Sequence, residues 1–201
     1  MKKVFLPIVL LALCAFGVVE STLTEAEREF AIKELTRTHD HFLNTLEGLN
    51  EEQLNYKVTD DSWSIAECAE HIAISENLIF GMLQGTLAQE PDPSKRAEVK
   101  VTDEGLIAMI EDRSNKVKTG EPFEPSGKYG SFEETVEEFK TKRKEHIGFV
   151  KDTQDDLRNR YQQLPFGTID AYQILLFMSG HTERHIKQME EVLDDEDFPM
   201  D

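Results

Sequence analysis

The stretch LLFMSGHTERHIKQMEEV, residues 175–192, decides the fold because its apolar residues recur every three or four positions. This spacing predicts an α-helix from about Ile169 to Leu193 with one face turned toward a core. Two histidines, His181 and His185, lie on that same face. The apolar members of the face are Ile174, Met178, Met189 and Val192. Residues four apart on a helix lie about 5–6 Å from each other, so these two imidazoles could share one cation.

Helix-capping boxes mark three further long helices, each beginning with Ser or Thr followed three residues later by Glu. The pairs are Thr24 with Glu27, Ser64 with Glu67, and Ser131 with Glu134. Helical spacing of apolar residues then predicts helices over about 24–49, 64–85 and 131–157, with a shorter one over 103–113. No segment of useful length alternates with period two, as a strand would.

Two proline- and glycine-rich segments, residues 89–100 and 119–130, are predicted to be long loops. The second, TGEPFEPSGKYG, is a candidate wall or lid over any site that the helices form. The predicted fold class is therefore all-α: an antiparallel four-helix bundle with one shorter extra helix and two long loops.

The first residues differ from the rest of the chain. Lys2 and Lys3 precede an apolar run that ends at Phe16, followed by the small residue Gly17. This pattern predicts a signal peptide over residues 1–17 and one helical domain over 18–201, exported to the periplasm or secreted. A lipoprotein modified at Cys14 is less favoured because the preceding Leu13 is bulky.

Composition excludes some classes of function. The 201-residue chain has a formal net charge of −18 at pH 7, which disfavours binding to nucleic acid, since phosphates require clustered Lys and Arg. No membrane span is expected in the mature chain, because no later segment is continuously apolar over about 20 residues. Only Cys68 follows the predicted cleavage site, so an internal disulfide is not expected.

A third histidine, His71, lies on the inward side of the helix predicted over 64–85, together with Cys68, Ile74 and Leu78. A single inward histidine is often a hydrogen-bonded core residue. Three of them on two helices of a bundle instead favour a metal centre. Imidazole ligands suit zinc, nickel, iron or copper, and three protein ligands leave a position open for water or substrate.

Three segments of the sequence together resemble the DinB family of four-helix proteins. They are DDSWSIAECAEHIAISE at 60–76, FEETVEEFKTKRKE at 132–145 and LLFMSGHTERHIKQMEEV at 175–192. The resemblance covers about residues 24–193. It implies a bundle that holds a divalent metal, usually zinc or nickel, through His71, His181 and His185. Similar proteins include thiol transferases and many of unassigned activity, so the family constrains the scaffold better than the reaction.

Four further residues are candidates for the pocket or for contacts that orient the ligands. Glu67 lies one turn before His71 and could orient its imidazole, or could serve only in the capping box. Arg143, on an apolar helix face, could bind a substrate carboxylate or phosphate, or pair with a buried acid. His146 shares that face, and His39 is expected in the core or lining the pocket.

These observations favour an exported metal-dependent hydrolase acting on an unidentified small molecule. A metal-binding or stress-related protein without turnover is the alternative from another class. Thiol transfer is a third possibility, which export makes doubtful because low-molecular-weight thiol cofactors are cytosolic. A homodimer formed through outer helix faces is also compatible with a bundle of this type.

Overall fold

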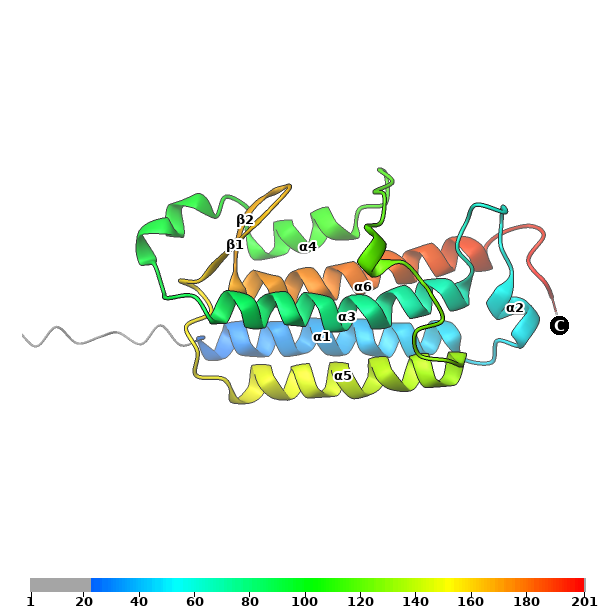
Figure 1. Ribbon diagram of the computed structural model, residues 1–201, viewed down its shortest axis with the longest axis horizontal. Coiled ribbons are helices and arrows are strands. Elements are labelled where there is room, and N and C mark those ends of the chain that lie inside the picture. Colours follow the sequence, from blue (N-terminus) through cyan, green and yellow to red (C-terminus); the bar gives the residue numbers. More distant parts are fainter. Residues whose placement is uncertain (1–22, 201) are drawn as a thin grey trace, which may run out of the picture.

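The computed structural model describes residues 23–200, and the predicted signal peptide lies outside them. Four long helices run side by side: α1 (Glu25–Leu46), α3 (Ile65–Leu87), α5 (Phe132–Asp152) and α6 (Ala171–Leu193) (Figure 1). The predicted four-helix bundle is confirmed. The expected capping boxes are present at Thr24, Ser64 and Ser131, and Asp170 with Gln173 forms another at the start of α6.

The order and direction of the helices follow from their contacts. Helices α1 and α5 pack antiparallel, as do α3 and α6, whereas α1 and α6 run parallel, and so do α3 and α5 (Figure 1). Two long helices that follow each other in the chain and run parallel require a connection that returns along the length of the bundle. Residues 88–131 make this return between α3 and α5, and they carry the short helix α4 (Asp103–Glu111), which packs along α6.

The connections contain more regular structure than their sequences indicate. The link after α1 contains α2 (Glu51–Asn55), and the two predicted loops contain short 3₁₀-helices, η1 (Pro93–Glu98) and η2 (Glu121–Phe123). A small antiparallel hairpin, β1 (Tyr161–Leu164) with β2 (Gly167–Asp170), precedes α6. Four-residue strands are too short to produce a period-two signal, and their pairing depends on a tight turn at Pro165 and Phe166.

Helix ends also differ from the expected ones by a few residues. Helix α5 ends at Asp152 rather than near Leu157, and α6 begins at Ala171 because Asp170 caps it. Within residues 23–200, no helix combines the length and apolar character that crossing a membrane would require.

The apolar core is divided into two clusters by a polar layer at the middle of the bundle. One cluster includes Leu35, Leu83 and Val150, and the other includes Phe42, Ile72 and Phe139. Between them lie buried polar side chains from all four long helices. These are Thr38, Ser75, Glu76, Arg143, His146, Ser179 and Thr182. The candidate site lies beside this layer, where α3 faces α6.

Candidate metal centre

Three imidazoles from two antiparallel helices converge on one point. His71 lies on α3, and His181 and His185 lie one turn apart on α6. The Nε2 atom of His71 is 3.4 Å from that of His181 and 3.0 Å from that of His185. In the described part of the chain this trio forms a group that could hold a metal ion, with its ligand atoms all within 4.8 Å of one another.

The outer nitrogens of two of these rings are fixed by acceptors. The Nδ1 of His71 donates to the carbonyl of Phe123 at 2.7 Å. The Nδ1 of His185 donates to the side-chain Oε1 of Gln188 at 2.9 Å, and Arg113 donates to the same oxygen. Because a carbonyl oxygen only accepts, each Nδ1 must carry the proton, which leaves each neutral Nε2 unprotonated. The Ser75 hydroxyl lies 3.5 Å from the Nε2 of His71.

Two facing lone pairs at 3.0 Å repel each other unless a cation lies between them. A proton is disfavoured there: burial lowers the pKa of His71, and burial with the charges of His181 and His71 lowers that of His185 well below its usual range. Burial and the charge of His71 lower the pKa of His181 to about 3. Bonds of about 2.0–2.1 Å to one tetrahedral ion separate two nitrogens by about 3.4 Å, so the trio fits a divalent metal.

An apolar cavity of about 640 Å³ opens over the three histidines. Helix α3 contributes Leu78 and Met82, α4 contributes Met109, and the hairpin turn contributes Phe166. Phe123 of η2 forms part of the wall, so the segment 119–130 supplies a wall, as its composition indicated. The cavity volume lies within the range of about 300–1,000 Å³ that is usual for small-molecule sites.

The segment that supplies this wall is attached to α3 by two adjacent residues. The carboxylate of Glu70 accepts hydrogen bonds from the backbone N–H groups of Ser126, Gly127 and Lys128, at 3.2, 3.0 and 2.6 Å. The next residue, His71, donates to Phe123 in the same segment. The wall of the pocket and the orientation of one candidate ligand therefore depend on the same short stretch of helix.

Trp63, which precedes α3, packs against the histidines. Its ring centroid is 4.9 Å from that of His71 and 6.1 Å from that of His185. The indole covers one side of the cluster and restricts the rotation of both rings.

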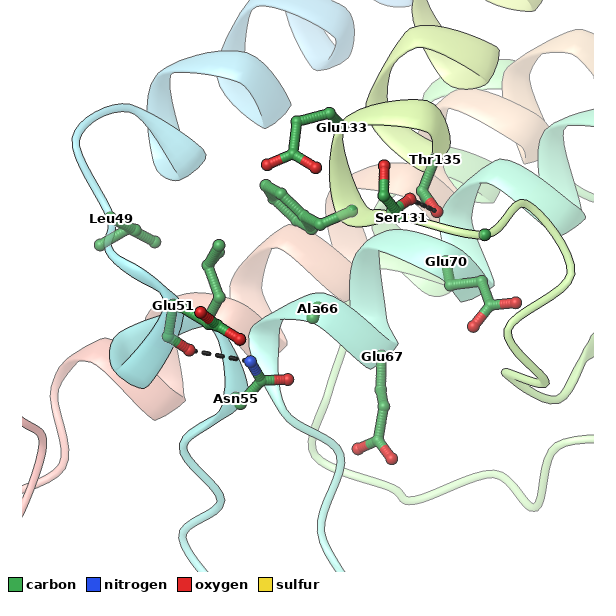
Figure 2. A pocket seen from close by; sticks show the side chains of 12 residues that line it. Leu49, Glu51, Asn55, Ala66, Glu67, Glu70, Ser131, Glu133 and Thr135 are labelled. Carbon is green, nitrogen blue, oxygen red and sulfur yellow. Dashed lines mark hydrogen bonds between the residues drawn. The ribbon is translucent and has the colours of Figure 1, made fainter.

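Glu67 does not contact the histidines. Its carboxylate accepts the backbone N–H of Ser64 at 2.8 Å and pairs with Lys57 at 2.8 Å, so it serves the capping box. Glu67 lines a separate hollow at the end of the bundle, shared with Glu51 and Glu133 (Figure 2). The orientation of His71, which Glu67 was a candidate to fix, is fixed by Phe123 instead.

Arg143 is completely buried in the polar layer and pairs with an acid, as one of the two interpretations proposed. It donates to both carboxylate oxygens of Glu76 at 2.8 Å. Its other three N–H groups donate to the Leu35 carbonyl and to the hydroxyls of Thr38 and Thr182. All five donors of the guanidinium are thus used, and none is left to hold a substrate.

His146 and His39 lie away from the metal centre. The Nδ1 of His146 contacts Glu76 at 2.8 Å, and its ring stacks on Phe80 with the centroids 3.8 Å apart. His39 is half-buried, contacts Asp40 at 2.8 Å and stacks on Phe139. Of the two places expected for His39, the pocket is excluded because the apolar cavity contains no residue of α1, and its ring packs on Phe139 of the core.

Glu183 and Arg184, two of the three residues between His181 and His185, contact α1 and α4. Glu183 is buried, and Arg37 and His41 of α1 contact its carboxylate at 2.9 and 3.1 Å. Arg184 lines the apolar cavity and donates to the carbonyls of Ile110, Asp112 and Asn115. Helices α1 and α4 both pack against α6. They therefore cover sides of α6 that its apolar periodicity alone would leave exposed to solvent.

Several residues of the site gave no usable signal in the sequence. Phe123 and Glu70 reach His71 and the wall through hydrogen bonds that depend on where the return segment lies, whereas Gln188 bonds to His185 within α6. Gln188 was the most accessible of these to sequence reasoning, because it follows His185 by three positions and therefore lies on the same helix face.

Comparisons with known proteins agree with this fold. The model of the DinB superfamily matches residues 34–189. The uncharacterized protein YuaE of Bacillus subtilis (strain 168) is 27% identical over 150 residues, which cover 74% of this chain and 88% of YuaE. The solved structure of YfiT from Bacillus subtilis superposes with a TM-score of 0.56 at 15% identity, covering 85% of this chain and 88% of YfiT. YfiT is described as "a probable metal-dependent hydrolase with an unusual four-helix bundle topology".

Proposed function

This chain belongs to the DinB superfamily, and from that premise we propose that it is a metal-dependent hydrolase of a small molecule. Its divalent ion, zinc or nickel, would be held by His71, His181 and His185. The observation that carries the proposal is the pair of facing, unprotonated Nε2 atoms of His71 and His185, 3.0 Å apart at the base of a cavity. The description of YfiT supports the same class of reaction.

A divalent ion with three imidazole ligands supplies Lewis-acid polarisation of a substrate oxygen and activates water near neutral pH. The protein's own residues prepare this site. Phe123 and Gln188 hold two rings with their Nε2 lone pairs directed inward. Trp63 and the apolar wall place nonpolar side chains around the cluster, which strengthens electrostatic interactions inside it. The net reaction adds water across an acyl or phosphoryl bond.

Metal analysis combined with a substrate screen tests the proposal. We expect purified protein to contain about one divalent ion per chain, and the loaded protein to turn over some members of an ester, amide and phosphoester panel. His71→Ala should abolish both. His39→Ala is the matched control, since that histidine is far from the cluster, and it should change neither. Metal binding without turnover on the whole panel would instead support the non-catalytic alternative.

We also propose that the protein is exported, because residues 1–17 have the pattern of a signal peptide. Mass spectrometry of the protein recovered from its native compartment tests this directly. A mature amino terminus near residue 18 is expected, whereas a chain retained in the cytosol with Met1 intact would refute export.

A further inference from the structure

We infer that the substrate carries an apolar acyl or aryl group, which binds in the cavity beside the histidines. This inference rests on the proposed function for the bond that is cleaved. The apolar character of the substrate is inferred from the side chains that line the cavity. Five parts of the fold supply that lining: α3, α4, the segment with η2 that follows α4, the hairpin and α6. The apolar side chains are Leu78, Ile79, Met82, Met109, Ile110, Val117, Phe123, Leu164, Phe166 and Phe177.

The exposed apolar residues of the protein are concentrated at this cavity. In residues 23–200, six large apolar side chains are exposed, and four of them line it. These four are Leu78, Met109, Val117 and Phe166. Scattered exposed apolar residues need no explanation, but a group of them around one concave site marks a place where an apolar ligand binds.

The polar part of the cavity lining is smaller than the apolar part. The three histidines lie at its base, and Lys118, Thr119 and Arg184 complete the polar part of the lining. Beyond Thr119 and Arg184 a second hollow begins, which also includes His185 and is lined by Arg113 and Lys116. A ligand with its cleavable bond at the histidines would thus have its apolar group toward Phe166 and its polar group toward this second hollow.

A small molecule is a better occupant of the cavity than a second copy of the chain. The space is a concave volume of about 640 Å³ with histidines at its base, rather than a flat surface. Apolar pockets of this size that contain a few converging polar groups are typical of small-molecule sites.

Binding to the metal-free protein separates this inference from the proposed hydrolysis. Anilinonaphthalene sulfonate bound to the protein would be displaced by butanol, hexanol and octanol, followed by fluorescence. The affinity should rise about three- to fourfold per methylene group, since each buried methylene contributes a constant free energy. If the metal-loaded protein hydrolyses p-nitrophenyl esters, kcat/KM should rise in the same way from acetate to octanoate.

Two lysine substitutions on α3 provide a matched pair. Leu78→Lys places a charge at the mouth of the cavity and should weaken octanol binding by about tenfold. Gln84→Lys adds the same charge at another exposed position of the same helix, outside the cavity, and should leave binding unchanged. Lysine is a good helix former, so neither change should unfold α3.

Affinity that does not increase with chain length, or an equal effect of the two substitutions, would overturn the inference. Sedimentation velocity gives a further check: a wild-type dimer that Leu78→Lys converts to monomers would show that a second copy covers the cavity, which also overturns it. Absence of turnover combined with chain-length-dependent binding would refute the hydrolase proposal alone. Turnover without any dependence on chain length would refute the apolar specificity alone.

Discussion

The Nε2 atoms of His71 and His185 lie 3.0 Å apart although 114 positions separate the two residues in the chain. Antiparallel packing of α3 on α6 brings them together. Phe123 and Gln188 turn both lone pairs toward the same point. The cluster is thus built by helix packing and oriented by residues outside it.

Removal of one imidazole should remove the metal. We expect His185→Ala to weaken zinc binding by more than about 100-fold, because changes in outer contacts alone cost about 10–100-fold. Titration of the metal-free protein with zinc against a competing chelator measures the affinity. His41→Ala, a histidine of α1 outside the cluster, is the control. Equal affinity in the two variants would contradict the assignment of His185 as a ligand.

Loss of an orienting contact should have a smaller effect. Gln188→Leu removes the acceptor of the His185 Nδ1 proton, so that ring is free to turn or to take the other tautomer. Zinc affinity should fall by about 10–100-fold while one ion still binds. Gln84→Leu, on the exposed side of α3, should bind zinc like the wild type. If Gln188→Leu binds zinc normally, the ring is held by the packing of Trp63 alone.

The buried pair of Glu76 and Arg143 should dominate the acid sensitivity of the bundle. Burial raises the pKa of Glu76, but the charge and hydrogen bonds of Arg143, with those of His146, outweigh it and lower the pKa to about 2. Because the folded pKa is depressed, the stabilisation is complete above the unfolded pKa of about 4.5. It should be lost as the pH falls from about 4.5 toward 2.

Substitution of one partner of this pair tests the same contact at neutral pH. Arg143→Met leaves a buried carboxylate without its cation and should lower the free energy of unfolding by about 3–5 kcal/mol. The double variant Arg143→Met with Glu76→Gln should recover part of this loss, because no buried charge remains unpaired. Urea denaturation gives the values, and a double variant no more stable than Arg143→Met would argue against charge pairing as the cause.

The metal-free protein should lose stability below about pH 6.5. In the unfolded chain each imidazole titrates near that value, whereas burial and the charge of His71 lower the pKa of His181 to about 3 in the folded protein. Between these values the unfolded chain binds more protons, so the free energy of unfolding falls as the pH is lowered. Urea denaturation at pH 7.5 and 5.0 should show a smaller drop for His181→Gln than for the wild type. His39→Gln should show the full wild-type drop.

Much of this architecture could be predicted from the sequence by itself, because it is encoded locally. Capping boxes at Thr24, Ser64 and Ser131 mark helix starts through contacts three residues apart, and helical spacing places His181 and His185 on one inward face. The predicted helix boundaries differ by a few residues from the observed ones at Asp152 and Ala171. The hairpin between them was not predicted, because its strands are too short for a periodic signal.

Only the tertiary structure decided which inward polar residues form the centre. His71, Arg143 and His146 all lie on inward helix faces. Helix α3 directs His71 toward α6, where it meets His185. The same helix directs Glu76 toward α5, where Glu76 binds Arg143 and His146 in the polar layer. Periodicity shows that a side chain faces inward, but not which helix it meets. That depends on the direction in which the return segment 88–131 carries the chain, and the same segment supplies Phe123 and one wall of the cavity.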